Sequence, residues 1–167
     1  RMKHQVRVCT SEDLDSMLHL ARAMHQESPV YKVLPLDSVK LLTLAETAIS
    51  FPDLATILIT TDDDGLITGM LGAISTTEFF GPSISTCDLF LYVKKEYRGS
   101  RAAIKLVRAY QKWAESLGAT RIHLGVTTGM LIKETGGLYE ALGFKQSGIL
   151  YTRNNPHGTS QTQSSSS

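Results

Sequence analysis

A group of basic residues surrounds one glycine near the middle of the chain, where a strand is expected to give way to a helix. The basic residues are Lys94, Lys95, Arg98, Arg101 and Lys105, and the glycine is Gly99. A helix begins with unpaired N–H groups and the positive end of its dipole, and both attract anions. Glycine lets the backbone approach a ligand closely. The stretch therefore predicts a phosphate-binding turn, and an ordinary solvated basic loop is the alternative reading.

Two common phosphate motifs do not explain this turn. A nucleotide-binding P-loop requires Gly-Lys-Ser/Thr, which does not follow Gly99. The dinucleotide-binding fingerprint requires three spaced glycines, which are also missing.

Metal binding is not expected either. His19 and His25 lie six residues apart on a predicted helix, whereas two ligands on one helical face lie four apart. The three aspartates at 62–64 lack the spacing and the final glutamate of a calcium loop, so we interpret them as a solvated turn.

The elements around the basic turn form a β-α-β unit. Residues 89–93 are a continuous apolar run, which is typical of a buried strand. After Ser100, apolar residues recur on one helical face until Gly118, where a left-handed cap is expected. Residues 121–126 then return to strand, and the two strands should be parallel.

The rest of the chain predicts a mixed α/β fold. We expect a strand at 6–9, helices at about 12–25 and 37–50, and a hairpin of strands 56–60 and 66–76 that turns at Asp62–Gly65. A further helix within 132–142 should start near Gly136 and Gly137, because glycines inside a helix are costly. Residues 144–153 should supply the last strands. The fold class is thus α/β, with a central mixed sheet of about six to seven strands and about four helices.

Composition indicates one globular domain. Residues 1–153 form this domain, and 154–167 form a polar Ser/Thr/Gln-rich tail. Seventeen basic and sixteen acidic residues give a net charge of +1, so we expect neither a membrane nor nucleic acid as a partner. The two cysteines give no disulfide framework, and we expect a cytoplasmic protein.

The turn also resembles the GNAT superfamily of acyl-CoA-dependent N-acyltransferases. Its signature, Arg/Gln-x-x-Gly-x-Gly/Ala, is similar to the segment from Arg98 to Ala103, with Arg101 in place of the middle glycine. A second segment, Leu138 to Phe144, is similar to the family's Tyr-x-x-x-Gly-Phe. The resemblance spans roughly residues 5–154 in element order, and the form of the turn is like that of bacterial and phage members.

This resemblance implies acetyl-CoA as co-substrate and no metal. It places the pantetheine along Leu91, Tyr92 and Val93. It places the pyrophosphate at the turn, whose residues are Arg98, Gly99, Ser100, Arg101, Ala102 and Ala103. The family also implies that the loop at 26–36 shapes the acceptor pocket, although an ordinary helix connection is equally consistent.

There are two catalytic candidates, of which the first follows from the resemblance and the second from the residues of the central strand. Tyr139 matches the family tyrosine that can protonate the departing CoA thiolate, and a packing role is the alternative. Asp88 is the one carboxylate on the central strand, where we expect it to share a face with Phe90 and Tyr92. It is the candidate general base, and capping of the strand start or pairing with an arginine are the alternatives. The other candidates for the base are Glu78, His25, His123 or a chain of waters.

The sequence therefore predicts an N-acetyltransferase in which a primary amine attacks acetyl-CoA directly in a ternary complex. The alternative is a weak or inactive GNAT-like domain that binds acyl-CoA and acts in regulation or protein interaction. The acceptor amine is not identified by any charge pattern, and a homodimer stays open.

Overall fold

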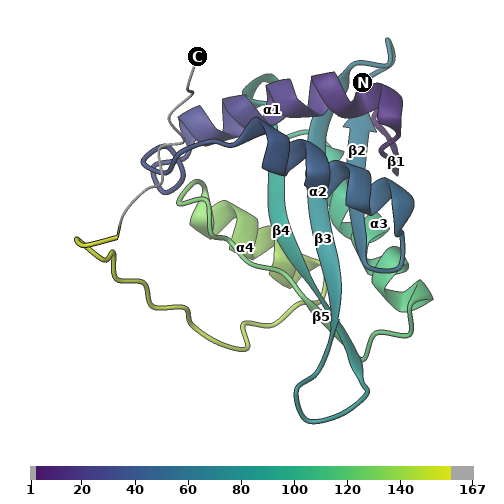
Figure 1. Ribbon diagram of the computed structural model, residues 1–167. Coiled ribbons are helices and arrows are strands. Elements are labelled where there is room, and N and C mark those ends of the chain that lie inside the picture. The colour runs from purple at the N-terminus through teal and green to yellow at the C-terminus, as the bar shows by residue number, and fades with distance from the viewer. Residues whose placement is uncertain (1–2, 159–167) are drawn as a thin grey trace.

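A computed structural model describes residues 3–158 and contains one mixed sheet with helices on both faces (Figure 1). The strands are β1 (Gln5–Val8), β2 (Ala55–Thr61), β3 (Ile67–Thr77), β4 (Ile84–Val93) and β5 (Arg121–His123). The α-helices are α1 (Leu14–Glu27), α2 (Ser38–Ser50), α3 (Ala102–Ser116) and α4 (Ile132–Ala141). Two short 3-10 turns, η1 (Ser11–Asp13) and η2 (Lys95–Tyr97), precede α1 and α3.

The strands lie in the order in which they occur along the chain. Each of the first three strands pairs with the next in antiparallel fashion, and β5 joins β4 in parallel. The β4-α3-β5 crossover is the parallel β-α-β unit that the sequence predicts, although β5 ends at His123 and not at Val126.

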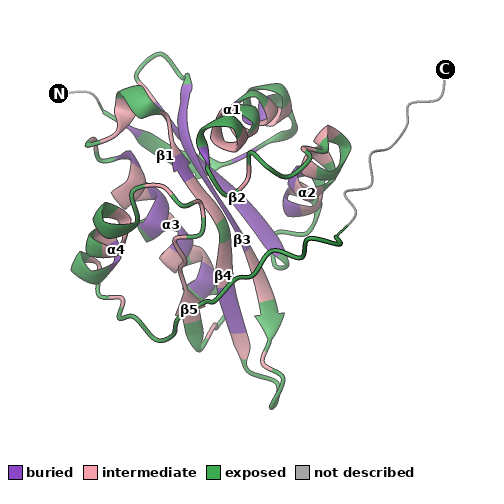
Figure 2. Cartoon of the chain, turned by 90° about the vertical axis from the view of Figure 1, so that its left-hand side faces the viewer, coloured by how far each residue is buried: buried purple, intermediate pink, exposed green. Residues whose placement is uncertain are grey.

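Helices α1 and α2 cover one face of the sheet, and α3 and α4 cover the other (Figure 2). This arrangement makes two apolar cores. The first packs α1 and α2 against residues such as Ile59, Met70 and Tyr92, and the second packs α3 and α4 against Leu58 and Leu71. Burial is deepest along β2 and the first half of β3, which lie in the centre of the sheet between the two helical layers.

Local sequence signals explain where the helices begin and end. The Asp37 carboxylate accepts the backbone N–H of Lys40 at 3.1 Å and so caps α2. Gly118 has a φ of +73° immediately after α3, as the sequence predicts for a left-handed cap. The β2–β3 turn closes at Gly65, which has a φ of +80°.

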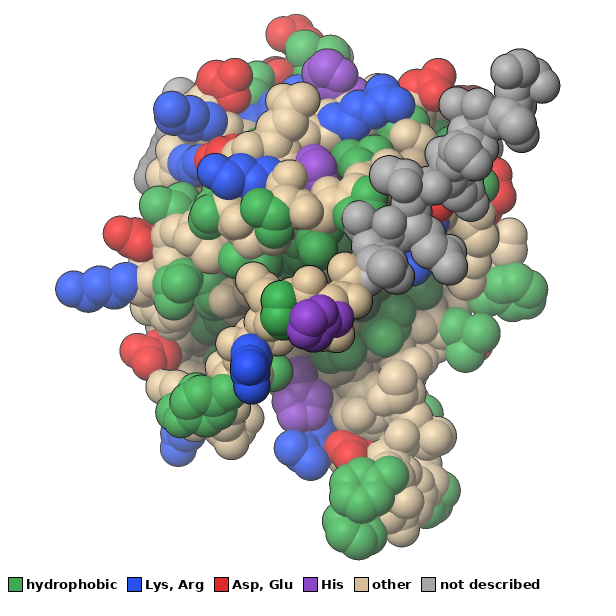
Figure 3. Space-filling model, turned by 60° about the vertical axis from the view of Figure 1, so that its left-hand side comes forward, with side chains coloured by type: hydrophobic (Ala, Val, Ile, Leu, Met, Phe, Trp, Pro, Cys, Tyr) green, Lys and Arg blue, Asp and Glu red, His purple; other side chains and the backbone are tan. Residues whose placement is uncertain are grey.

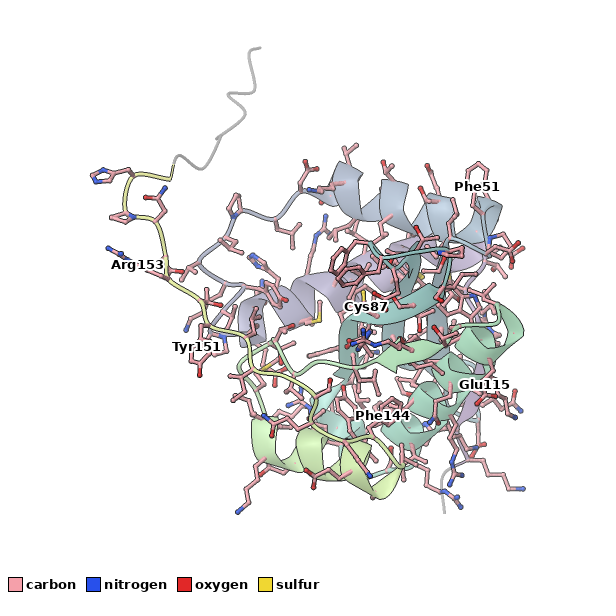
Figure 4. The ribbon with its side chains drawn as sticks, turned by 90° about the horizontal axis from the view of Figure 1, so that it is seen from below. Phe51, Cys87, Glu115, Phe144, Tyr151 and Arg153 are labelled. Carbon is pink, nitrogen blue, oxygen red and sulfur yellow. The ribbon has the colours of Figure 1, made fainter. Side chains whose placement is uncertain are left out.

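The expected number of strands is wrong for the part of the chain described. Six to seven strands were expected, and residues 3–158 contain five. Residues 145–153 are exposed and pair with no strand, although Ile149, Leu150 and Tyr151 are apolar. Figure 4 shows Tyr151 and Arg153 on this outlying segment, whereas Phe144 lies among the helices. A strand needs a partner edge, and β5 is only three residues long.

The start of α4 also differs from the prediction. The helix begins at Ile132, so Gly136 and Gly137 lie inside it. A Cβ added at either glycine would meet no atom within 4 Å, so space does not require glycine there. The polar tail was expected at 154–167; residues 154–158 are exposed, and 159–167 lie outside the described residues.

Candidate active site

The parallel strands β4 and β5 stay together for three residue pairs and then separate. Their pairing ends at Cys87 and His123. Beyond that point β4 runs on to Val93 with only β3 beside it, so its other edge offers unpaired backbone groups to a cleft. The separation therefore creates a site where an extended ligand can add to the sheet through main-chain hydrogen bonds.

A β-bulge shifts β4 where the strands separate. Asp88 pairs with Ala73 and Phe90 pairs with Gly72, so Leu89 is an extra residue in the ladder. Asp88 and Leu91 therefore face α3 and α4, whereas Phe90 faces α1 and α2. The expectation that Asp88 shares a face with Phe90 and Tyr92 is wrong, because the bulge reverses the alternation of side chains.

Asp88 and Tyr139 both hold Gly125, the second residue after β5. The backbone N–H of Gly125 donates to Asp88 Oδ1 at 2.8 Å. The Tyr139 hydroxyl donates to the Gly125 carbonyl at 3.2 Å. We call these three residues the splay end of the cleft, because they lie where β4 and β5 separate.

Burial shifts the acidity of both side chains at the splay end. Removal from water raises the pKa of Asp88 to about 6, against the lowering effect of the Gly125 N–H. Burial and, to a smaller extent, the Asp88 charge raise the pKa of Tyr139 above that of a free phenol. Near neutral pH the splay end thus contains a carboxylate whose pKa is close to the ambient pH and a phenol that is still protonated. These are the protonation states that a general base and a general acid require.

The opposite end of the cleft is the basic turn before α3. Gly99 has a φ of +81°, which a side chain would adopt only with strain. Residue 101, which replaces the second motif glycine, has a φ of −83°, so an arginine fits there without backbone strain. Within the described chain, the backbone N–H groups of Ala103 and Ile104 have no acceptor, and they lie at the start of α3 as an anion site requires.

Two of the five basic side chains at this turn have partners in the protein. Lys105 Nζ donates to the His4 carbonyl, and Arg98 donates through Nη2 to Glu27 Oε2 at 2.8 Å and through Nε to the Val93 carbonyl at 3.0 Å. The other three, Lys94, Lys95 and Arg101, form no ion pair with any residue in 3–158. The Glu27 carboxylate offsets the charge of Arg98, whereas the neutral His4 carbonyl leaves the charge of Lys105 in place.

Arg98 forms the centre of a second polar cluster, which we call the motif end. Its guanidinium lies 5.5 Å from the centre of the Tyr92 ring, and the Tyr92 hydroxyl donates to Glu27 Oε2 at 2.7 Å. The Arg98 hydrogen bond lowers the pKa of Glu27, and burial together with Glu27 raises the pKa of Tyr92 to about 12. The cluster thus joins the last residue of α1 to β4 and to the turn.

Between the two ends lies a cleft of about 300 Å³. Its lining comes from β4, the turn, α3, the segment after β5, and α4. Figure 3 shows this side of the molecule hollowed, with hydrophobic side chains in the hollow. Of the eleven residues expected at the site, nine line the cleft: Asp88, Leu91, Tyr92, Val93, Arg98, Gly99, Ser100, Ala103 and Tyr139. Arg101 is exposed outside it, and Ala102 is buried beneath it.

The alternative candidates for the base lie elsewhere. Glu78 pairs with Arg121 at 3.4 Å, His25 Nε2 lies 2.7 Å from the Leu34 carbonyl, and His123 ends β5. None of these side chains lines the cleft, whereas Asp88 does.

The loop between α1 and α2 covers the far side of the segment after β5. Ser28 Oγ donates to the Thr128 carbonyl at 2.6 Å, and the Tyr31 hydroxyl lies 3.2 Å from Thr127 Oγ1. A Cβ at Gly129 would come within 2.9 Å of the Val30 side chain, so glycine permits the close approach. Thr127 and Thr128 also line the cleft, so the loop packs against one of its walls.

Sequence reasoning missed Glu27 and Gly125. Glu27 is the last residue of α1, where a carboxylate is disfavoured by the helix dipole. A carboxylate in that position signals a compensating cation, and Arg98 supplies it. Gly125 functions only through its backbone, so no side chain could have indicated it.

Among residues 3–158, no helix is long and apolar enough to cross a membrane. In the same residues, no three His, Cys, Asp or Glu side chains are grouped closely enough to hold a metal ion.

The family described as the acetyltransferase (GNAT) domain matches residues 53–146, which is more than half of the chain and includes both the turn and Tyr139. No curated protein matches the sequence significantly.

Solved structures share the fold at low sequence identity. An acetyltransferase from Trypanosoma brucei is 19% identical with a TM-score of 0.70, over 92% of this chain and 100% of that one. The AAC(6')-Iy enzyme, solved with a CoA bisubstrate analogue, is 17% identical with a TM-score of 0.72, over 92% and 99%. A glucosamine-6-phosphate N-acetyltransferase from Arabidopsis thaliana is 15% identical with a TM-score of 0.72, over 91% and 99%.

Proposed function

The chain belongs to the GNAT acetyltransferase family, and on that premise we propose that it transfers the acetyl group of acetyl-CoA to a primary amine. The observation that carries the proposal is the cleft itself. An unpaired strand edge leads from a carboxylate and a phenol at one end to a glycine turn and a helix N-terminus at the other.

We expect acetyl-CoA to lie along this cleft. Its pantetheine amides would pair with the open edge of β4 at Leu91, Tyr92 and Val93. Its pyrophosphate would accept hydrogen bonds at the turn, where the N–H groups of Ala103 and Ile104 are free within the described chain. The thioester would then lie at the splay end.

The amine attacks the thioester carbonyl carbon, and the C–S bond breaks to release the CoA thiolate. Asp88 accepts the proton that the amine loses, directly or through a water, and Oδ2 is the oxygen for this role because Oδ1 holds Gly125. Tyr139 donates its proton to the thiolate. A phenol is a weaker acid than a thiol, so this contribution is moderate in size.

We propose direct attack in a ternary complex rather than a covalent acyl-enzyme. Within residues 3–158 the cleft lining contains no cysteine and no lysine that could carry the acyl group. The α1–α2 loop gives the amine its own entry beside Thr127 and Thr128, so both substrates can be bound together.

The test combines binding and turnover. Calorimetric titration with acetyl-CoA should show one site per chain, and a thiol-release assay on a panel of primary amines should find an acceptor. Binding without turnover on every amine would favour the alternative, an acyl-CoA-binding module without catalysis.

A pair of glycine variants locates the cofactor. Gly99 and Gly118 both have positive φ, and a Cβ at either meets no atom within 4 Å. Gly99→Val should weaken acetyl-CoA binding roughly tenfold, since a β-branched residue strains the turn. Gly118→Val strains the end of α3 equally and should leave affinity unchanged. Equal affinities in the two variants would place the CoA elsewhere.

A further inference from the structure

Phe90 separates the cleft from a second cavity on the other side of β4. The second cavity, of about 50 Å³, lies between α1, α2 and the sheet, and Phe90 lines both spaces. Its other walls include Met17, Met24, Ile57 and Met70, and no charged side chain of residues 3–158 contributes to it.

The position of the Phe90 ring depends on two features of the sheet. The bulge at Leu89 turns Phe90 to the face opposite Asp88, toward α1 and α2. Opposite it stands Gly72, where an added Cβ would lie 2.5 Å from the ring atoms Cε1 and Cζ. A side chain at 72 would therefore displace the ring, and glycine is what allows the ring to occupy this place.

The cavity suits an alkyl chain. Its walls are apolar, and three methionines give them soft, adaptable side chains. A water-sized group needs about 10–15 Å³ of such space, so the cavity holds roughly three or four groups of that size. Nothing in the proposed acetyl transfer uses this volume.

We propose that Phe90 sets the length of the acyl group that the enzyme accepts. This inference rests on the proposed function, which puts the thioester at the splay end beside Asp88, one bulged residue away from Phe90. The ring closes the path from the thioester into the cavity, so an acetyl group fits and a longer acyl chain meets the ring. Removing the ring joins the two spaces and admits a chain of up to about six carbons.

The experiment measures the dissociation constants of acetyl-CoA and hexanoyl-CoA for each variant by calorimetry. In the unaltered protein acetyl-CoA should bind the more tightly. In Phe90→Ala the preference should move toward hexanoyl-CoA by at least tenfold, because each buried methylene is worth roughly fourfold. Phe90→Leu retains more apolar volume in the core, so the preference should move toward hexanoyl-CoA by a smaller factor. This variant provides the test if Phe90→Ala does not fold.

A matched control refills the cavity. Ala45 is buried and lines the cavity from α2, away from the cleft. Adding Ala45→Leu to Phe90→Ala should remove most of the gain for hexanoyl-CoA and leave acetyl-CoA binding as in the single variant.

Three results would overturn the inference, and they differ in meaning. An unchanged preference in both Phe90 variants, or hexanoyl-CoA bound as tightly as acetyl-CoA by the unaltered protein, removes Phe90 as the length determinant and leaves the proposed function intact. If the unaltered protein binds no acyl-CoA at all, both the role of Phe90 and the proposed function are wrong.

Discussion

The two ends of the cleft contain similar side chains in different electrostatic surroundings. The splay end consists of Asp88, Tyr139 and the backbone of Gly125, and no cationic side chain of residues 3–158 is in hydrogen-bond contact with it. The motif end pairs the Glu27 carboxylate with the Arg98 guanidinium and a second tyrosine, Tyr92. Each end therefore combines one carboxylate with one phenol, and within the part of the chain that the structure describes the motif end alone adds a positive charge.

The difference shows what each carboxylate is suited to do. Without a cation, burial raises the pKa of Asp88 to about 6, so its proton can come and go near neutral pH. Beside Arg98, the pKa of Glu27 is lowered, so it keeps its charge and serves as an anchor. We infer that the splay end performs proton transfer and that the motif end holds the turn in place.

The largest effect on turnover is expected when the charge of Asp88 is removed. Asn at position 88 can still accept the Gly125 N–H, so Asp88→Asn preserves the shape and removes the base. Turnover should fall by roughly 10²- to 10³-fold. In the unaltered protein the rate should rise with pH through about 6, and the variant should lose this dependence. A variant that keeps both its rate and the rise near pH 6 would remove Asp88 from the mechanism.

The next largest effect is expected for the phenol at the same end. Tyr139→Phe keeps the ring and removes the acid, so turnover should fall by roughly 10²-fold. The melting temperature should also fall, because the hydrogen bond to Gly125 is lost.

Tyr110 provides the matched control for Tyr139. Its buried hydroxyl lies 2.8 Å from the His123 carbonyl, two residues before Gly125, but the residue does not line the cleft. Tyr110→Phe should lower stability by about 1–3 kcal/mol and leave turnover near that of the unaltered protein. Equal turnover in the two variants would show that Tyr139 only packs.

At the motif end the expected effect is on binding rather than on chemistry. Glu27→Gln releases Arg98, so the turn becomes less ordered and the dissociation constant for acetyl-CoA should rise about three- to tenfold with little change in maximal rate. Glu78→Gln is the control, since Glu78 also pairs with an arginine, but its partner Arg121 does not line the cleft, whereas Arg98 does. A large fall in maximal rate in Glu27→Gln alone would give Glu27 a part in proton transfer.

The comparison also shows what the sequence could and could not predict. The turn, α3 and Gly118 follow from local patterns, because caps and helical faces are encoded within a few neighbouring residues. The link from Glu27 to Arg98 spans 71 residues, and no local pattern contains it.

A single inserted residue had the largest consequence for the site. Alternation along β4 predicts one face for Asp88 and Phe90, and the bulge at Leu89 puts them on opposite faces. The apolar residues at 149–151 predict a strand on the same local grounds, and no partner strand is present among the described residues. Pairing between distant segments decides both cases.

The smallest effect, and the one that tests the comparison most directly, is the pH dependence of stability. The folded pKa of Asp88, about 6, is above its ordinary value of 3.8. The stability that its protonated form contributes is therefore complete below about pH 4 and is lost as pH rises through 6. For Glu27 the folded pKa is below the ordinary value of 4.5, so its contribution is present above that pH and is lost as pH falls below it.

The two charge-removing variants should therefore differ from the unaltered protein in opposite directions. Between pH 4 and 7, the melting temperature of the unaltered protein should fall by a few degrees relative to that of Asp88→Asn. As pH falls from 5 to 3, the melting temperature of the unaltered protein should fall relative to that of Glu27→Gln. Thermal melts of the three proteins across this range measure both differences, and other titrating groups cancel because all three share them. If both differences had the same sign, the two carboxylates would occupy similar environments, and the division of the cleft into a proton-transfer end and an anchoring end would be wrong.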